Sequence, residues 1–402
     1  MWGIPYALYN FYLSLYMKSQ GVTDKQIGFL ISLGFISAIV FSMLAGPITD
    51  ALGRKKTTLI FDIMGWPCAI LIYALAHDFW MFVLAIIVNG AHRVTAVSYN
   101  LMVIEDSNSN QRFAAFNLIN IINISAGLLT PIAGLAVKTY GIAKAERFLL
   151  IFAVISMTTM MFSRYHFHVE TQIGQKILKE RLKHNKKLGF RKDLYKGVFA
   201  DLYRKPTVFM IMCVIILFNM YITIGTHLSL YFVPYMSEVL GIEKSMISLL
   251  GVVNAATMIT TLVFINPVIS RRNTINNMMI GLALQAVSLF LLVIISGNNF
   301  FIVVLCLAIF AAGFGIFRPF ADSMMAELTE GKARAIIYSL MNTGISTLSA
   351  VMGFVSGYLY DLNPRLIYIT SIFILSLCLV ILVVLKRSIP VDYANTHGTS
   401  CL

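Results

Sequence analysis

Three charged residues that lie inside long apolar runs are the first candidates for chemistry in this chain: Arg93, Arg318 and Asp322. A charge at the centre of a membrane helix costs about 2.5 to 3.5 kcal/mol on insertion scales, so each needs a partner or water. At about 1.5 Å per residue, Arg93 lies about 18 Å of helix before Glu105, the acid at the end of its run. Arg93 is therefore expected near the middle of a bilayer, where it can bind an anionic group or set the protonation of an acid.

Arg318 and Asp322 are four residues apart, so their side chains can meet on one face of a helix. Two interpretations stay open for this pair. It can be a self-neutralising structural device, or Asp322 can take up a proton and release Arg318. Further candidates for the lining of a cavity are polar side chains of the first and seventh apolar runs: Asn10, Asn219 and His227.

An enzyme would need a nucleophile with its base, or a cluster of metal ligands. The histidines and acids are scattered among different runs, and four of the five cysteines fall in apolar runs. We therefore expect no catalytic centre, metal site or disulfide framework. The sequence also lacks the G-x-x-x-x-G-K-[ST] motif that binds nucleotide phosphates, so we expect neither ATP nor another cofactor.

The densest charge pattern is the stretch Gly46 to Thr57, G-P-I-T-D-A-L-G-R-K-K-T, in which Pro47 is expected to end a helix. The apolar runs on either side are each about as long as a membrane crossing, so the stretch must lie at one membrane face. Three consecutive cations, Arg54 to Lys56, mark that face as cytoplasmic. Asp50 lies four residues before Arg54, where it can pair with it or cap another helix. This arrangement predicts a latch between conformations.

The stretch resembles the G-x-x-x-D-[RK]-x-G-[RK]-[RK] signature of the major facilitator superfamily (MFS), of the prokaryotic type. The residues that carry the match are Gly46, Asp50, Gly53, Arg54 and Lys55, whereas Ala51 stands where the family usually has a cation. The resemblance implies two six-helix halves that rock about a substrate site near mid-membrane. It also implies that the helix with Arg93 lines the cavity, which favours proton coupling or substrate binding over a structural ion pair.

Composition independently indicates a polytopic membrane protein. Hydrophobic residues make up 58% of the chain, charged residues 12%, and the mean hydropathy is +0.80. The net charge of +13 does not indicate a nucleic-acid partner, because the cations are confined to loops. They are concentrated in the segments that lie inside when both termini are cytoplasmic, which predicts a multi-pass protein of the cell (plasma) membrane.

The fold expected is all-α, with twelve transmembrane helices in two six-helix pseudo-repeats. The first run begins at Met1 with no charged region before it, so we expect that the natural chain starts upstream. The apolar runs are 1–17, 27–46, 58–76, 79–103, 113–137, 147–165, 207–233, 245–269, 275–296, 299–325, 335–360 and 366–385.

These runs group into a first half (1–165), a basic cytoplasmic linker (166–206), a second half (207–386) and a cytoplasmic tail (387–402). Within the linker, apolar residues recur every four positions from Leu194 to Leu202 among basic residues. This pattern predicts an amphipathic helix on the inner membrane surface, acting as a joint attracted to anionic lipid or as a partner-binding segment.

An internal repeat supports two halves, because G-A-H-R ending at Arg93 corresponds to G-I-F-R ending at Arg318. An acid with a cation seven residues on follows each copy, Glu105 with Arg112 and Glu327 with Arg334, at an offset of 222 residues against 225 for the arginines. With Asp62, which is expected to extend the Asp50 network, they form a predicted cytoplasmic charge network: Asp62, Glu105, Arg112, Glu327 and Arg334.

The function expected is secondary active transport of a small molecule by alternating access, driven by a proton or solute gradient. Aromatic residues and a scarcity of charge in the cavity favour efflux of an amphiphilic compound. Uptake of a nutrient or metabolite by symport is the alternative, and a transporter-like membrane sensor is the alternative from another class. We expect a monomer whose partners are the substrate, protons and the lipid bilayer.

Overall fold

The computed structural model describes residues 3–105, 119, 122–184, 206–225, 229–269, 273–295, 299–328 and 333–388. Within these residues every regular element is a helix and no strand occurs, which confirms the predicted fold class. The chain divides into two compact units, Met1–Phe190 and Arg191–Leu402, and this division falls inside the segment expected to be a linker. The domain boundaries given above stay a prediction.

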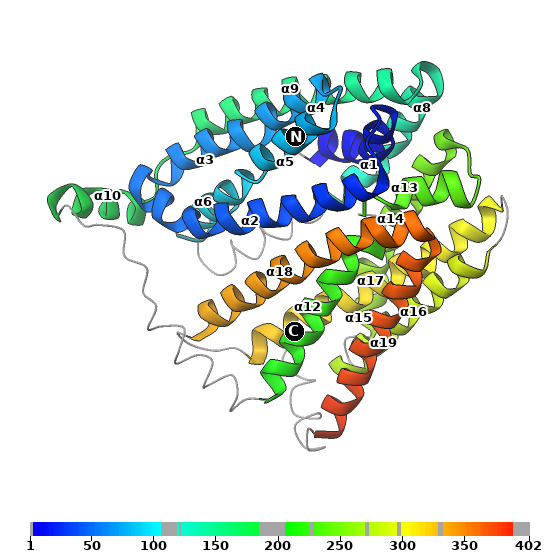
Figure 1. The fold of residues 1–402 in the computed structure, drawn as a ribbon. Helices are drawn as coiled ribbons and strands as arrows, with labels where there is room; N and C mark the ends of the chain where they lie inside the picture. The colour runs from blue at the N-terminus through cyan, green and yellow to red at the C-terminus, as the bar shows by residue number, and fades with distance from the viewer. Residues whose placement is uncertain are drawn as a thin grey trace. The chain divides into compact units, whose positions relative to one another are not determined.

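The first unit is built around α9, which packs against α1, α4 and α8, while α6 packs against α2 and α3 (Figure 1). Local sequence fixes the helix ends. Thr23 caps α2 in a reciprocal capping box with Gln26, and the Asp78 carboxylate accepts the Met81 N–H at 2.9 Å before α5. The elements are α1 (Gly3–Ser19), α2 (Asp24–Leu52), α3 (Arg54–Ile63), η1 (Met64–Cys68), α4 (Ala69–Leu75), α5 (Phe79–Asn89), α6 (His92–Glu105), η2 (Gly127–Leu129), α8 (Thr130–Tyr140), α9 (Ile142–Phe167) and α10 (Gln172–His184).

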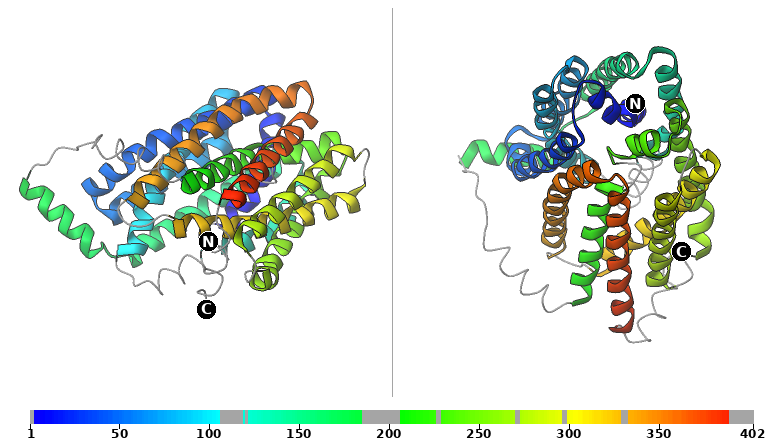
Figure 2. Two further views of the ribbon diagram at one scale, coloured as in Figure 1. Left: turned by 90° about the horizontal axis from the view of Figure 1, so that it is seen from below. Right: turned by 45° about the vertical axis from the view of Figure 1, so that its right-hand side comes forward.

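In the second unit α17 packs against α16 and α14, and α12 packs against α18 and α19. Figure 2 shows α12 and α19 running side by side. The elements are α12 (Pro206–Gly225), α13 (Phe232–Pro234), η3 (Tyr235–Val239), α14 (Lys244–Thr260), η4 (Thr261–Ile265), α15 (Asn266–Ile269), α16 (Thr274–Ile294), α17 (Phe300–Leu328), α18 (Ala333–Leu362) and α19 (Arg365–Ser388).

Ten helical segments among the described residues are long and apolar enough to cross a membrane. Two of them run through several elements: Arg54–Leu75 joins α3, η1 and α4, and Lys244–Ile269 joins α14, η4 and α15. The first and eleventh predicted runs are occupied by α1 and α18. Many large apolar side chains on the outer faces of these helices are exposed, as a lipid-facing surface requires.

The prediction that Pro47 ends the second helix is wrong. α2 continues through Pro47 to Leu52, and it ends at Gly53, whose φ of 84° is readily adopted by glycine. Proline is tolerated inside membrane helices because neighbouring groups satisfy the backbone that it leaves unpaired. Asp50 therefore lies in the last turn of α2, and Arg54 is the first residue of α3.

Among the described residues there are three short π-helical turns, each at or within two residues of a proline, and two of them, η1 and η4, interrupt candidate membrane helices. Pro67 lies inside η1, Pro234 directly precedes η3, and Pro267 follows η4. A proline removes one backbone donor and crowds the preceding turn, which a wider turn relieves. At η1 the side-chain amide of Asn89 donates to the Gly65 carbonyl at 2.8 Å, so a backbone acceptor of the turn is satisfied.

The internal repeat is visible in how closely the helices pack. A methyl group added to Gly90 would collide with the Ser37 side chain, and one added to Gly315, its counterpart in the repeat, would lie 3.1 Å from Thr261. In both units, therefore, the helix that carries the repeated arginine approaches the equivalent earlier helix at a glycine. Small residues of this kind permit close backbone approach in membranes.

A second pair of contacts follows the same correspondence. A methyl group on Gly65 would lie 2.5 Å from the backbone nitrogen of His92, and one on Gly281 would lie 2.8 Å from that of Phe317. His92 and Phe317 occupy the same position of the repeated motif, one residue before Arg93 and Arg318. The packing around the two arginines is thus built in the same way within each unit.

Candidate functional site

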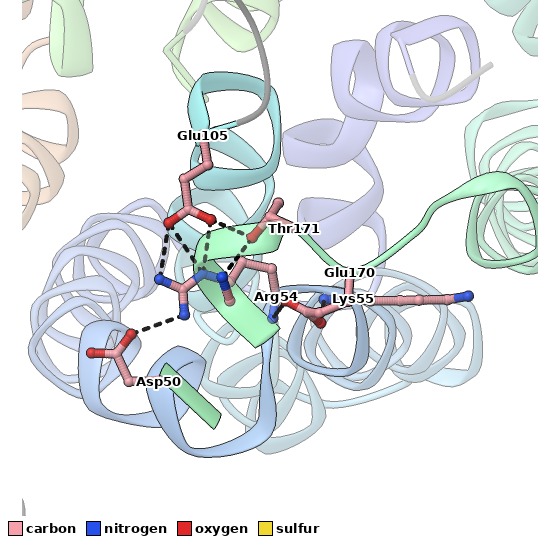
Figure 3. Close-up of polar contacts among 7 residues, drawn as sticks. Asp50, Arg54, Lys55, Glu105, Glu170 and Thr171 are labelled. Atoms are coloured by element: carbon pink, nitrogen blue, oxygen red, sulfur yellow. Dashed lines mark hydrogen bonds and ion pairs between the residues drawn. The ribbon is translucent and has the colours of Figure 1, made fainter. Parts of the chain in front are cut away.

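The side chain of Arg54 is the centre of a polar cluster at the break between α2 and α3 (Figure 3). Only 3% of the residue is exposed. Its Nη1 lies 3.0 Å from Asp50 Oδ1, and its Nη2 lies 2.9 Å from Glu105 Oε1 on α6. The planar guanidinium thereby binds two acids from two different helices, which a lysine cannot do with the same geometry.

The backbone at the same position is bound by a third acid, Glu170. Its Oε1 accepts the N–H of Arg54 at 2.8 Å, and its Oε2 accepts the N–H of Lys55 at 2.9 Å. These are the first two N–H groups of α3, which have no partner inside the helix. Glu170 thus caps α3 from a distant part of the chain, and its charge is favourable at a helix N-terminus.

Thr171, the next residue, links this cap to α10. Its hydroxyl donates to Glu105 and accepts the N–H of Gly174 at 2.9 Å, so Thr171 caps α10. The cluster of Asp50, Arg54, Glu105, Glu170 and Thr171, which we call the Arg54 cluster, holds the ends of α2, α3, α6 and α10 together. Movement of any one of these helix ends would break at least one charge-assisted bond.

The sequence analysis did not identify Glu170 or Thr171, because both lie in the segment treated as a linker. A signal was present: Thr171 precedes a run of helix-forming residues, and an acid lies directly beside it. The helix of this segment that the structure describes is α10, whereas the amphipathic pattern of 194–202 lies outside the described residues.

Asp62 was expected to extend the Asp50 network, but the structure pairs it with another cation. Asp62 is buried, and its carboxylate forms an ion pair with Arg164, near the end of α9. The Arg164 guanidinium also lies over the Tyr99 ring, 5.1 Å from its centre. Arg164 carried no local signal, because it is one of several basic residues near the end of an apolar run.

A small depression lies beside this pair, between α3 and α9, with Lys55, Arg164 and His168 among its lining residues. The Lys55 ammonium group lies 4.4 Å from the centre of the Tyr165 ring. Burial, together with the positive charges of Arg164 and Lys55, lowers the pKa of His168. The imidazole is therefore neutral at neutral pH and adds no charge to this region.

Arg93 is exposed and makes no ion pair with the residues that the structure describes. Its neighbour His92 is tied to the break between α5 and α6, since its Nδ1 lies 2.6 Å from the Asn89 carbonyl and its ring lies 5.0 Å from that of Trp66. Trp66 in turn meets Tyr6 of α1 edge to face at 5.8 Å. An aromatic group thus lies beside Arg93, whereas Asn10 is half-buried elsewhere on α1.

In the second unit, three predicted residues come together. Arg318 Nε donates to Asp322 Oδ2 at 2.9 Å, and Arg318 Nη1 donates to Asn219 Oδ1 of α12 at 3.2 Å. The Asn219 amide is itself oriented by donating to the Ile215 carbonyl at 2.8 Å. The side chains of Arg318 and Asp322 are 39% and 55% exposed, so neither is enclosed by the second unit.

The remaining predicted residues take no part in this description. His227 and Arg112 lie outside the described residues, and so do the side chains of Glu327 and Arg334. Gly46 lies inside α2, where a methyl group would meet nothing within 4 Å.

The sequence model of the Major Facilitator Superfamily matches residues 3–233 and 225–399. No curated protein sequence matches the chain.

Solved transporter structures share the fold over nearly the whole chain. A D-xylose-proton symporter superposes with a TM-score of 0.74 at 13% identity, covering 99% of this chain and 97% of that one. The nucleoside transporter NupG gives 0.65 at 16% identity, with 96% of each chain covered. A bacterial homologue of the iron transporter ferroportin in an inward-facing state gives 0.69 at 12% identity, again with 96% of each chain covered. At such low identity the likeness shows the fold alone.

Proposed function

The chain belongs to the major facilitator superfamily, and we propose that it is a proton-coupled secondary active transporter of a small molecule in the cell membrane. Transport would proceed by alternating access, with both termini and the Arg54 cluster on the cytoplasmic side. A single chain would suffice for this activity. The concentration of cations in the segments next to the predicted inner ends of the helices supports this orientation.

The observation that carries the proposal is the triad of Arg318, Asp322 and Asn219. An ion pair on a membrane helix favours a functional role, because apolar residues in the same span would have a lower free energy of insertion. When Asp322 takes up a proton it no longer neutralises Arg318. Asn219 remains as an acceptor for the guanidinium. Arg318 therefore keeps its hydrogen bond to Asn219 while its bond to Asp322 is lost.

Arg93 has a matching role in the first unit under this proposal. It carries a charge without an ion pair among the described residues, and it lies within electrostatic range of Tyr6, whose ring meets that of Trp66. A cation next to aromatic faces can bind an amphiphilic anion or the polar end of an amphiphilic solute. This supports export of an amphiphilic compound as the direction of transport.

Uptake by symport is the second candidate. It is favoured by the likeness to a D-xylose-proton symporter, whose fold this chain shares. A nucleoside transporter and a bacterial homologue of an iron transporter have the same fold, so the fold does not select a substrate.

The proposal can be tested with purified protein in liposomes, by measuring flux of a compound library with an imposed proton gradient of either direction. We expect at least one compound whose flux follows the gradient and falls when a protonophore collapses it. Asp322→Asn should weaken this dependence, whereas Glu243→Gln, at an exposed acid of the same unit, should leave it unchanged. Flux that ignores the gradient in the unmodified protein would contradict proton coupling.

A further inference from the structure

Glu146 is a buried acid that neither the Arg54 cluster nor the Arg318 triad uses. It lies in α9, shortly after the helix begins at Ile142. Its exposed fraction is 0%, and neither of its carboxyl oxygens has a hydrogen-bond partner in the part of the chain that the structure describes. Buried acids in proteins are ordinarily paired or hydrogen-bonded, so this arrangement calls for an explanation.

Ionisation of Glu146 in this conformation would be costly. An uncompensated carboxylate in an apolar interior is disfavoured by many kcal/mol, and proteins avoid that cost by keeping the group protonated. The neutral carboxyl is therefore the form that fits this packing. Even the neutral form leaves polar atoms unpaired, which costs about 1 to 3 kcal/mol per group. The chain thus has an acid at a position where glutamine, leucine or methionine would fill similar space and could not ionise.

The groups around Glu146 do not supply a counter-charge. On α1, Tyr9 lies within electrostatic range of Glu146, and on α4 Tyr73 lies within range of Tyr9. Both tyrosines are buried. Tyr6, also on α1, meets the Tyr9 ring edge to face at 5.7 Å. These phenols are neutral at physiological pH.

The cations nearest in the chain are directed elsewhere. Arg147 is exposed, and it donates to the Tyr16 hydroxyl and to the Gln20 side chain, each at 3.3 Å. Lys144 is exposed on the same helix, and on α8 Lys138 is exposed beside the exposed Tyr140.

The cations of two packed helices are also directed away from Glu146. On α1, Lys18 is paired with Asp24 at 2.9 Å. On α3, the cations Arg54 to Lys56 lie at the helix start, beside the far end of α9, where Lys55 lies over the Tyr165 ring.

On α3, Asp62 is paired with Arg164 toward the other end of α9, and η1 offers only Cys68, which is exposed. An ionised Glu146 would therefore find a partner only if the packing of α1 on α9 changed.

We propose that Glu146 binds a transported proton, holding it while α1 packs on α9 and releasing it to water when that interface opens. The carboxylic acid gives up H⁺ to water and becomes a carboxylate, which water solvates in the open form. The proposal rests on the proton-coupled transport proposed above. It adds a proton site in the first unit, separate from Asp322 in the second.

Two readouts test the proposal with the full-length protein. The first is the infrared carbonyl stretch of a protonated carboxylic acid, followed through a pH titration. We expect a band that Glu146→Gln abolishes, that Glu146→Asp retains, and that the control Glu243→Gln leaves unchanged. Glutamine has nearly the shape of the neutral acid, so recovery from the membrane and thermal stability of Glu146→Gln should match the unmodified protein. Persistence of the whole band in Glu146→Gln would overturn the assignment of the proton to Glu146.

The second readout is flux in liposomes at several values of the proton gradient. For each proton moved per cycle, an imposed gradient of one pH unit changes the equilibrium ratio of substrate concentrations across the membrane by up to about tenfold. Glu146→Gln should lose the part of this response that Glu146 carries, leaving the part carried by Asp322, while still exchanging substrate across the membrane. A normal gradient response in Glu146→Gln would overturn the coupling role. Failure of the proposed function has a different signature: the unmodified protein would show the infrared band but no gradient-dependent flux of any compound.

Discussion

The carboxylate of Glu170 binds the backbone N–H of Arg54 at 2.8 Å, although 116 residues separate the two in the chain. The side chain of the same arginine binds Asp50 and Glu105. One residue is therefore held at its backbone by one acid and at its guanidinium by two others. Because it joins the end of α2 to the start of α3, its position fixes the angle at which the chain turns.

Gly53→Ala should destabilise the protein by about 1 to 3 kcal/mol, because the residue has a φ of 84° and a methyl group there would lie 2.8 Å from Glu170 Oε2. The matched control is Gly46→Ala in the same motif, where the added methyl meets nothing within 4 Å. That change should be neutral or stabilising by up to about 1 kcal/mol, since alanine favours a helix interior. Thermal unfolding in detergent measures both. Equal stability of the two variants would contradict the positive φ of Gly53 and the close position of the Glu170 carboxylate.

Asp50→Asn should leave the protein folded and inserted but slow transport severalfold. The Asp50 side chain is 51% exposed, so losing its pair with Arg54 should cost at most about 0.5 kcal/mol of folding stability. If the pair forms in only one conformation, its loss would nevertheless shift the equilibrium between the inward-facing and outward-facing states. Substrate flux per inserted molecule measures the effect, with Lys56→Gln, at an exposed cation of the same region, as the control. Unchanged flux at equal membrane abundance would remove Asp50 from the latch.

Asp62→Asn should lower stability by about 3 kcal/mol, because it leaves the partly buried Arg164 without its counter-charge. Arg164→Met alone leaves the buried Asp62 unpaired and should be similarly harmful. The double variant should recover much of the loss, since it removes both charges together. The thermal stabilities of the unmodified protein, the two single variants and the double variant together give a double-mutant cycle. Simple additivity of the two losses would show that the ion pair is not what holds α3 to α9 at this point.

Arg93→Lys should reduce transport steeply while keeping the charge, because lysine lacks the planar fork of donors. Arg93→Ala should be recovered from the membrane in near-normal amounts, since Arg93 makes no structural ion pair with the described residues. Flux per inserted molecule across external pH distinguishes a functional from a structural role. Near-normal flux and an unchanged pH profile in the lysine variant would leave Arg318 and Asp322 as the better candidates for coupling.

Contacts between residues close in the chain were readable from spacing. The four-residue intervals from Asp50 to Arg54 and from Arg318 to Asp322 predict the pairs that the structure contains, because residues four apart meet on a helix or across its end. The fold class followed from hydropathy for a similar reason, since a membrane helix satisfies its own backbone.

Contacts between distant residues were not readable in this way. Arg164 reaches Asp62, and Asn219 reaches Arg318 across 99 residues, only because whole helices pack side by side. Asn219 was selected as a polar residue in an apolar run, without its partner. Pro47 was misjudged because its effect on a helix depends on which neighbours satisfy the freed carbonyl.

The π-helical turns also determine where deletion of a single residue can be tolerated. A π-turn bonds residue i to residue i+5, so it accommodates one residue more than the same stretch of α-helix. Deletion of one residue inside η1, Met64–Cys68, would return that stretch to α-helical bonding while Arg54 and Ala69 keep their faces. The same deletion within α9 would rotate everything after it by about 100°, since a turn holds 3.6 residues. The π-helical turns beside Pro67 and Pro267 thus mark places where a membrane helix of this protein can lose a codon without turning the residues that follow.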